Sequence, residues 1–396
     1  MSKTRAGTIR KQIPLLAVSM MLLLALAGCI GDPASETIII PENERSGMEV
    51  QVGDAFQVDK LYPLPVSGSP GMQVLGWTSG DSVVGEFSDR ATSVATTLSN
   101  RIQLLALPYE KPQQLANAEG MGNGLLSLSP DGKRIAKVPS PNDGGFLTLV
   151  PLDEGPVQKI ELPTRSLPSR HLAWSNNSRY ISYLVAGDSR EELHIVVCDT
   201  ADGSAKEMRL LNAKTLSGGT AILPENGGTA VVSDDGGSVL IDNGKEVVAA
   251  KRNEDTDFEV LYYHPSGIGG TTWIDSDRFV FLGGDGTLFQ YDIRNGELSV
   301  LLEKVQSFSL SRDRKIIAYA LNDKETIYAG KLQGNNVLLQ TTVYQGIVPV
   351  QMIWSLSNSS LLVDGNPPLN TTGPRTSASI PAEAEAWLQT FVIRFK

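Results

Sequence analysis

The feature that most constrains the fold of this 396-residue chain is a short segment that recurs along it. In its clearest copy, SLSPDGKRIAKV from Ser127, a polar stretch separates Leu128 from a strand of alternating apolar residues. Related segments begin at Gly76, Ala173, Ile222, Thr272, Ser309 and Ile353, and a Trp or Leu precedes the polar stretch in each copy: Trp77, Leu128, Trp174, Leu223, Trp273, Leu310 and Trp354. The spacing of about 46 residues is typical of a repeated unit of four strands.

The polar stretch of the clearest copy has the composition of a tight turn. Pro130 presets its own φ angle, Asp131 can accept hydrogen bonds from nearby backbone amides, and Gly132 can adopt a positive φ. A turn of this kind fixes the register of the hairpin that it closes. We therefore interpret SPDGK as a structural element and not as a binding site.

The residues between the copies predict further strands. After the copy at Thr272, short apolar runs alternate with Gly, Asp and Asn, and the copies at Ala173 and Ser309 follow the same plan. The chain contains 38 Gly and 22 Pro, which favours many chain reversals, and no helical period is evident beyond the N-terminal segment. We expect an all-β fold, a seven-bladed β-propeller of four-stranded blades over residues 48–396.

The last copy lacks a strand of its own. After Trp354 the chain offers only two further strands, residues 359–364 (SSLLVD) and 387–395 (WLQTFVIRF), which a polar stretch over residues 365–385 separates. An N-terminal strand must supply the fourth, either residues 48–52 (MEVQV) or residues 55–63 (AFQVDKLYP), and we favour the second segment. Such a closed ring leaves no open sheet edge between the first and last blades.

Residues 1–28 have the pattern of a targeting segment. An apolar run over residues 13–28 follows four basic residues, Lys3, Arg5, Arg10 and Lys11. The run LAGC, which ends at Cys29, resembles the lipobox of bacterial lipoproteins. That resemblance implies cleavage before Cys29 and attachment of acyl chains, such as palmitate, to this residue. The alternative is an uncleaved transmembrane helix, although the run is short for a span of about 20 residues.

The lipid on Cys29 implies a place for the protein in the cell. Two acyl chains would anchor the chain stably to a membrane, with residues 29–47 as a flexible tether. We expect a location in a bacterial cell envelope, on the outer face of the cytoplasmic membrane. Ile30 follows the lipidated residue where an Asp would signal retention, so the outer membrane is the alternative in a cell with two membranes.

The run SPDGKRIA, from Ser129 to Ala136, and its weaker relatives resemble the WD40-like or TolB-type propeller repeat, also described as PD40-like. The resemblance covers nearly all of the chain after the tether. It implies an interaction platform, since TolB-type propellers bind other proteins. The Gly-His and Trp-Asp signatures of WD40 repeats are absent, as is a separate N-terminal domain of the TolB kind.

Charge and motif content narrow the classes of function. The formal charge of −10 falls to about −14 without the basic residues of the first 28, which argues against nucleic acid as a partner. The three histidines, His171, His194 and His264, stand in different repeats, and neither a nucleophile elbow nor a phosphate-binding loop is present. Cys198 lies in a strand pattern, so we expect a buried thiol. We predict no catalytic residue and no cofactor, and we expect a monomer.

One set of residues could bind a cation. We expect each loop between a second and a third strand to carry an acid on the same face of the ring: Asp89, Asp143, Asp188, Asp234 with Asp235, Asp285, Asp323 and Asp364. Of these, Asp143, Asp188, Asp235, Asp285 and Asp323 are the candidate ligands for calcium, which prefers oxygen donors. The alternative is that these residues only form turns.

A second set could bind a partner. Residues 252–269 include Tyr262, Tyr263 and His264, and aromatic side chains on a propeller face are plausible anchors for another protein. The same residues also fit a fourth strand of the preceding repeat. The sequence thus leaves two functions open. The first is a non-enzymatic platform for an envelope protein or a cell-wall component, and the second is an extracytoplasmic enzyme or small-ligand or sugar binder with a site on the channel face.

Overall fold

The computed structural model describes residues 37–39, 54–65, 74–78, 81–87, 102–115, 125–138, 145–163, 171–186, 192–212, 228–254, 257–322, 325–366 and 389–396. The chain divides into two units, Met1–Ile38 and Ile39–Lys396. Strand β1 (Thr37–Ile39) lies at the division, and Cys29 and the predicted targeting segment lie outside the described residues. Among the described residues, no helix is long and apolar enough to cross a membrane.

The second unit is built from antiparallel sheets, with one short 3-10 helix, η2 (Asp54–Phe56), among its described residues. Five of the sheets contain the four-stranded meander of a propeller blade. The first two are β3 (Val74–Trp77), β4 (Val83–Glu86), β5 (Ile102–Leu105) and β6 (Gln113–Gln114), followed by β7 (Leu126–Leu128), β8 (Arg134–Lys137), β9 (Phe146–Pro151) and β10 (Gln158–Glu161).

Three more blades lie in the second half of the chain. They comprise β19 (Thr271–Trp273), β20 (Arg278–Leu282), β21 (Leu288–Asp292) and β22 (Glu297–Leu302); β23 (Val305–Leu310), β24 (Ile316–Leu321), β25 (Thr326–Gln333) and β26 (Asn336–Gln345); and β27 (Val348–Trp354), β28 (Ser360–Asn366), β29 (Gln389–Phe395) and β2 (Val58–Pro63). In the last of these blades, β2 pairs antiparallel with β29. The preference for the second N-terminal segment as the missing strand is confirmed.

The remaining sheet has eight strands and joins two such meanders. One is β11 (Ala173–Trp174), β12 (Tyr180–Ala186), β13 (Leu193–Asp199) and β14 (Ser204–Leu211), and the other is β15 (Thr229–Val232), β16 (Ser238–Asp242), β17 (Glu246–Arg252) and β18 (Phe258–Pro265). Their outer strands meet in a short parallel contact, in which Leu210 and Leu211 pair with Phe258 and Glu259. The all-β, propeller-like fold expected from the repeat is therefore observed.

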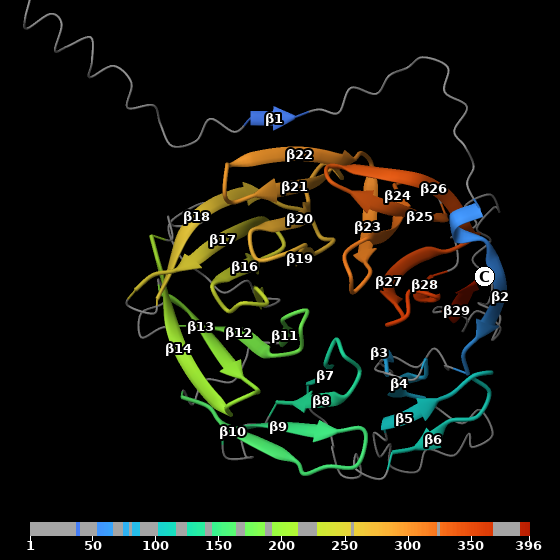
Figure 1. Ribbon diagram of the computed structural model, residues 1–396, viewed down its shortest axis with the longest axis horizontal. Helices are drawn as coiled ribbons and strands as arrows, with labels where there is room; N and C mark the ends of the chain where they lie inside the picture. Colours follow the sequence, from blue (N-terminus) through green and yellow to red (C-terminus); the bar gives the residue numbers. More distant parts are fainter. Residues whose placement is uncertain are drawn as a thin grey trace, which may run out of the picture. The chain divides into compact units, whose positions relative to one another are not determined.

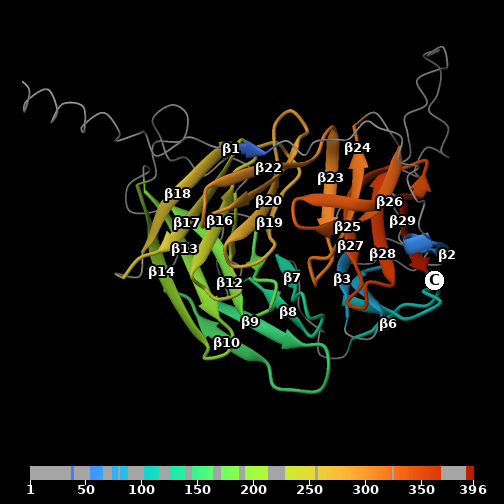
Figure 2. The same ribbon diagram turned by 45° about the horizontal axis from the view of Figure 1, so that its top comes forward.

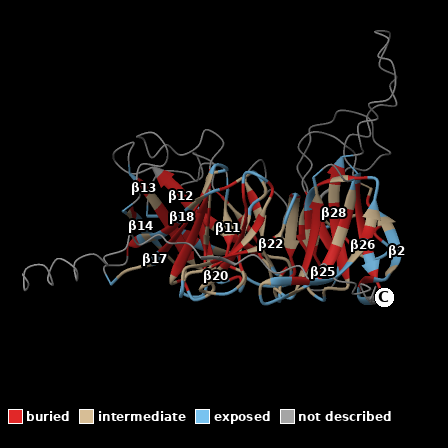
Figure 3. Ribbon diagram, turned by 90° about the horizontal axis from the view of Figure 1, so that it is seen from above, coloured by how far each residue is buried: buried red, intermediate tan, exposed pale blue. Residues whose placement is uncertain are grey.

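The sheets follow one another around a common centre in chain order (Figure 1), and the same arrangement is visible in the tilted view of Figure 2. The first strand of each meander lies nearest the centre and the fourth lies outside. Buried residues run along the strands, whereas exposed residues gather in the connections and on outer strands such as β2 (Figure 3). The two ends of the strands thus form two faces of the ring.

We call one of these faces the turn face. It carries the first-to-second turns (residues 78–82, 129–133, 175–179, 233–237, 274–277, 311–315 and 355–359) and the third-to-fourth connections. The other, the loop face, carries the second-to-third and fourth-to-first connections, because successive strands of an antiparallel meander reverse direction. Most residues outside the described set belong in sequence to connections of the loop face.

The core lies between neighbouring sheets, where apolar side chains of facing strands pack together. In one cluster Trp77 and Leu105 of the first blade pack with Leu362 and Val392 of the last, which closes the ring. The indole of Trp77 also donates a hydrogen bond to the carbonyl of Ile353, at 2.9 Å. Trp273 and Trp354 donate in the same way to Val231 and Ser309 of the preceding sheets, at 2.8 and 3.3 Å. The recurrent Trp therefore ties each of these blades to its neighbour.

The fourth copy of the repeat lies later in the chain than predicted. The alignment placed Leu223 before its turn, but Leu223 is outside the described residues, and Val232 ends strand β15 before the turn at residues 233–237. The register of β15 against β16, with Val232 opposite Val239, establishes SDDGG as the first-to-second turn. Both PENGG and SDDGG have turn composition, and the pairing of distant residues decides between them.

Candidate functional site

Five first-to-second turns share one pattern of hydrogen bonds around a buried serine: Ser129, Ser175, Ser233, Ser311 and Ser355. In four of them the hydroxyl donates to the side chain two residues later, Asp131, Asn177, Asp235 or Asp313, at 2.5 to 2.7 Å. In all five it also accepts the backbone N–H five residues later. The buried hydroxyl is thus satisfied within the turn, and the interpretation of SPDGK as turn chemistry is confirmed.

The same hydrogen bonds control the acids of these turns. Burial alone would raise the pKa of Asp235, but the Ser233 hydroxyl and the Gly237 amide outweigh it and hold the pKa below its usual range. The pKa of Asp313 is lowered in the same manner, against burial, by the Ser311 hydroxyl and the Lys315 amide. These carboxylates stay ionised at neutral pH because the turn donates hydrogen bonds to the charged form.

Neighbouring turns are joined into a chain across the turn face. The amide of Asp131 donates to the Ser178 hydroxyl at 2.9 Å. Asn177 donates to Asp234 through both its backbone N–H and its side-chain amide, each at 2.7 Å. Ser357 donates to Asp81 at 3.1 Å and so connects the last turn to the first. These bonds place the first-to-second turns together at one end of the ring.

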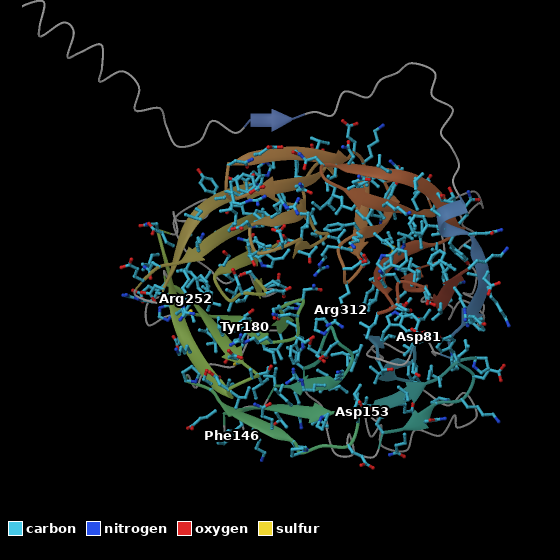
Figure 4. All side chains as sticks on the ribbon, viewed as in Figure 1. Asp81, Phe146, Asp153, Tyr180, Arg252 and Arg312 are labelled. Atoms are coloured by element: carbon cyan, nitrogen blue, oxygen red, sulfur yellow. The ribbon has the colours of Figure 1, made fainter. Side chains whose placement is uncertain are left out.

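Two turns also meet across the centre. The side chain of Asn176, in the turn after β11, donates to the backbone carbonyl of Arg312, in the turn after β23, at 3.1 Å. Figure 4 places Arg312 near the centre of the ring, whereas Phe146, Asp153 and Arg252 lie towards the outside. Arg314 belongs to the same turn and is influenced electrostatically by Asp234 and Arg312. The centre of the turn face therefore carries two guanidinium groups.

Two of the predicted calcium ligands lie within the described residues, and they lie on opposite faces. Asp285 follows β20 on the loop face, as predicted, and accepts hydrogen bonds from the Thr287 amide and hydroxyl at 2.9 and 3.0 Å. Asp234 and Asp235 instead belong to the turn between β15 and β16, because their repeat lies later in the chain than expected. The predicted common face is therefore wrong for these two residues.

The other predicted acids are not brought together among the residues that the structure describes. Asp143, Asp188 and Asp323, like Asp89, lie outside the described residues. Asp364 lies in β28 and accepts the Thr390 hydroxyl at 2.9 Å, and burial raises its pKa. Burial also raises the pKa of Asp242, at the loop-face end of β16. Within the described ranges, no group of three or more His, Cys, Asp or Glu side chains could hold a metal ion.

The aromatic residues proposed as partner anchors form part of strand β18, the alternative that the sequence left open. Tyr262 is only 7% exposed and stacks on Tyr291, with ring centroids 3.7 Å apart, so it belongs to the core and is not available as a surface anchor. His264 packs against Phe281, with centroids 5.1 Å apart, and pairs through Nδ1 with the Pro265 carbonyl. Tyr263 is 51% exposed and is the one of the three that presents most of its surface to solvent.

The remaining residues with catalytic potential are separated or buried. His171 lies just before β11 and His194 lies in β13 of the same meander, so the prediction that the three histidines stand in different repeats is wrong for these two. His171 is exposed, whereas His194 pairs through Nδ1 with Glu207 at 2.6 Å. Cys198 is buried, as predicted, and burial raises the pKa of its thiol to about 12. A thiol with that pKa is almost entirely protonated at neutral pH and is a poor nucleophile.

Two exposed apolar side chains stand near the inner strands on the loop face. Ile268, in the connection between β18 and β19, is 92% exposed, and Val350, near the start of β27, is 62% exposed. An added side chain at Gly267 would meet the Gly283 carbonyl, and one at Gly269 would meet Leu282. These glycines let the connection lie against β20 and its following turn, so Ile268 is held outward on a fitted backbone.

Comparison with known proteins yields similarity of fold only. No protein-family model matches the chain, and no curated protein matches it significantly. Similar solved structures include an oligogalacturonate lyase in complex with manganese (11% identity, covering 85% of this chain and 98% of that chain, TM-score 0.49) and a chain of a mitotic checkpoint complex (10%, 86%, 95% and 0.48). A protein of unknown function from Desulfotomaculum acetoxidans DSM 771 also matches (11%, 67%, 86% and 0.44). At these values the propeller-like fold rests on the sheets themselves, and no activity follows from the matches.

The sequence contained a signal for the central arginines that the turn interpretation passed over. Arg314, in SRDRK, stands where the clearest copy, SPDGK, has Gly132. Both residues have a positive φ, of 59° and 67° respectively. A long cationic side chain at a position that favours glycine departs from the turn rule, and such departures often mark a function.

Proposed function

We propose that this protein is a lipid-anchored lipoprotein of the bacterial cell envelope, whose closed, seven-bladed propeller binds an envelope protein or a cell-wall component. The seven blades are the five separate meanders together with the two in the eight-stranded sheet. The observation that carries the proposal of a binding platform is the presentation of Ile268 and Val350 on the loop face. In this proposal the propeller is a rigid support, and the loop face makes the contact.

The energetic argument concerns Ile268 above all. Burying an isoleucine side chain is worth about 2 kcal/mol, so full exposure forgoes a stabilisation that most folds use. Single exposed apolar residues are common, but this one is held outward by a backbone that two glycines fit against the next blade. In the proposed contact, Ile268 and Val350 are the central apolar anchors, and polar groups around them form the rim.

Site-specific photo-crosslinking in intact cells tests this platform. A photo-reactive amino acid at Ile268 should capture a recurrent partner, because the loop face makes the contact. The matched control is the same amino acid at Val157, which is apolar, 49% exposed and part of a third-to-fourth connection on the turn face. Capture of the same chains from both positions, or of none from Ile268, would argue against the proposal.

The lipid anchor is tested separately. Cys29→Ala removes the thiol that the lipobox resemblance assigns to acylation, and we expect the variant to leave the membrane fraction or to accumulate uncleaved. Metabolic labelling with a radioactive or clickable palmitate should mark the wild-type protein and not the variant. Equal labelling of the two proteins would rule out Cys29 as the acylated residue, whatever the result of the crosslinking.

A further inference from the structure

At the centre of the turn face, the side chain of Arg314 is cationic and has no hydrogen-bond or ion-pair partner among the described residues. The Nε atom of Arg314 is buried and has no hydrogen-bond partner, and its guanidinium makes no ion pair with any described residue. The residue as a whole is intermediate in exposure and keeps part of its surface in contact with solvent. A buried polar group without a partner is costly, and a buried charge more so.

The backbone of Arg314 carries a second cost. In the five serine turns, the residue three positions after the serine has a positive φ: Gly132, Ser178, Gly236, Arg314 and Asn358. Gly, Asn and Ser are small or can bond locally in this conformation, but a long side chain gains nothing from it and costs about 1 kcal/mol or more. Arg314 is the one long side chain of the five. Glycine would fit this position of the turn better, so the presence of an arginine here points to a role outside folding.

The nearby carboxylates are engaged elsewhere. Asp234 accepts the Asn177 amide, and Asp313 accepts the Ser311 hydroxyl and the Lys315 amide. The second guanidinium, of Arg312, also makes no side-chain hydrogen bond or ion pair with a described residue, while its backbone carbonyl receives Asn176. Burial lowers the pKa of Arg314 to about 10, and the like charge of Arg312 acts in the same direction, so Arg314 remains protonated at neutral pH.

We propose that Arg312 and Arg314 form an anion-binding site at the centre of the turn face, for a small molecule that carries a carboxylate group. The planar guanidinium fork matches the two oxygens of a carboxylate. The carboxylates of Asp234 and Asp313 balance the charge of the two arginines, which disfavours a phosphate dianion more than a carboxylate monoanion. This site lies on the opposite face from the proposed partner contact and is independent of it.

Thermal melting in matched salts tests the site. The probe is sodium acetate, compared with sodium chloride at equal ionic strength and pH 7. We expect acetate to raise the melting temperature of the protein by about 2 °C. Sodium phosphate forms a second arm at the same ionic strength. A larger rise with phosphate than with acetate would overturn the assignment to a carboxylate, and no rise above chloride in either arm would overturn the site itself.

Substitutions link the effect to the arginines. Arg314→Gly places at this position the residue that Gly132 and Gly236 provide in other turns, so it should fold, melt at a higher temperature than the wild type in chloride and lose the response to acetate. Arg312→Gln should lose most of the response without the gain in stability. Arg179→Gln is the matched control, because Arg179 is ion-paired to Asp199 at 2.7 Å on the same face, and it should keep the response.

Two outcomes would contradict the role assigned to Arg314. If Arg314→Gly melts at a lower temperature than the wild type in chloride, the arginine supports the fold and does not serve a ligand. If Arg314→Gly and Arg312→Gln both keep the full response to acetate, the anion binds elsewhere. Neither outcome bears on the crosslinking result at Ile268, so the two proposals fail separately.

Discussion

The turn face and the loop face of the ring differ in how regular their connections are. On the turn face, five turns repeat one arrangement of a buried serine, a polar acceptor and a residue of positive φ, and hydrogen bonds join each of several turns to the next. On the loop face, connections range from the three residues between β16 and β17 to the 22 between β28 and β29. The turn face repeats one hydrogen-bonded arrangement, whereas the connections of the loop face differ widely in length.

The comparison teaches where each kind of substitution has its effect. A turn that must satisfy a buried hydroxyl and fit against its neighbours tolerates few sequences, whereas a connection that only spans two strands tolerates many. The repeat is therefore visible in the sequence at the turn face and lost at the loop face. Arg314 is informative because it breaks the rule of the constrained face, and Ile268 because it is held in place on the variable one.

The largest difference between the faces is expected for glycine substitutions. Gly132 and Gly244 both have a positive φ, of 67° and 78°. An added methyl group at Gly132 would lie 2.4 Å from the Trp77 carbonyl, while nothing lies within 4 Å at Gly244. We expect Gly132→Ala to lower the free energy of unfolding by about 3 kcal/mol or more and Gly244→Ala by about 1 kcal/mol, measured by urea denaturation. Equal losses would mean that the packing between turns contributes little.

A smaller difference is expected for the two buried serines Ser233 and Ser266. The Ser233 hydroxyl donates to Asp235 and accepts the Ser238 amide at 2.9 Å, whereas Ser266 on the loop face makes one long contact of 3.4 Å with Asp242. Ser233→Ala leaves the buried Ser238 amide without its hydroxyl partner and removes one hydrogen bond to Asp235, so it should cost about 2 kcal/mol. Ser266→Ala should cost under about 1 kcal/mol. The same denaturation assay measures both, and the reverse order would refute the network interpretation of the turn face.

The smallest difference concerns how the free energy of unfolding depends on pH, in which Asp235 and Asp242 act in opposite directions. The folded pKa of Asp235 is below its unfolded value of about 3.9, so its stabilisation is present above about pH 4 and is lost as the pH falls through the folded pKa. The folded pKa of Asp242 is raised, so its ionised form destabilises the fold until the pH falls through that value. Solvent screens the contribution of the exposed Asp235, so we expect its effect on the free energy of unfolding to be small.

Denaturation of Asp235→Asn and Asp242→Asn between pH 7 and pH 3 measures these contributions. We expect the wild type to be more stable than Asp235→Asn at pH 7, with the difference vanishing at low pH. Relative to Asp242→Asn, the wild type should instead gain stability as the pH falls. Parallel curves for the wild type and both variants would show that the two carboxylates titrate as they do in the unfolded chain.

Much of the fold could be predicted because the repeat is local. The serine, the acceptor and the glycine of SPDGK fall within five residues, and the Trp or Leu before them is part of the same hairpin. The error at Leu223 arose where two turn-like segments, PENGG and SDDGG, competed, since only the pairing of β15 with β16 distinguishes them. The same error affected the predicted calcium ligands, because the misplaced turn put Asp234 and Asp235 on the wrong face.

The candidate site was beyond prediction for a different reason. That Asn176 reaches the carbonyl of Arg312 depends on which turns face each other across the ring, and no local pattern encodes it. The burial of Tyr262 against Tyr291 likewise depends on the packing of one blade on the next. Sequence periodicity shows which side chains point to the same side of a strand. The packing of one sheet on the next determines which residues those side chains contact.

The pairing of β2 with β29 has a consequence for how the chain reaches its folded state. Residues 58–63 are among the first of the second unit to leave the ribosome, yet their partners at residues 389–395 are made more than 300 residues later. Until then β2 has no sheet to join, and the first blade has no neighbour for Trp77. Ring closure joins residues that are far apart in sequence, so we expect it to come late in folding. We therefore expect resistance to proteases to appear only after residues 389–395 have been made and paired with β2.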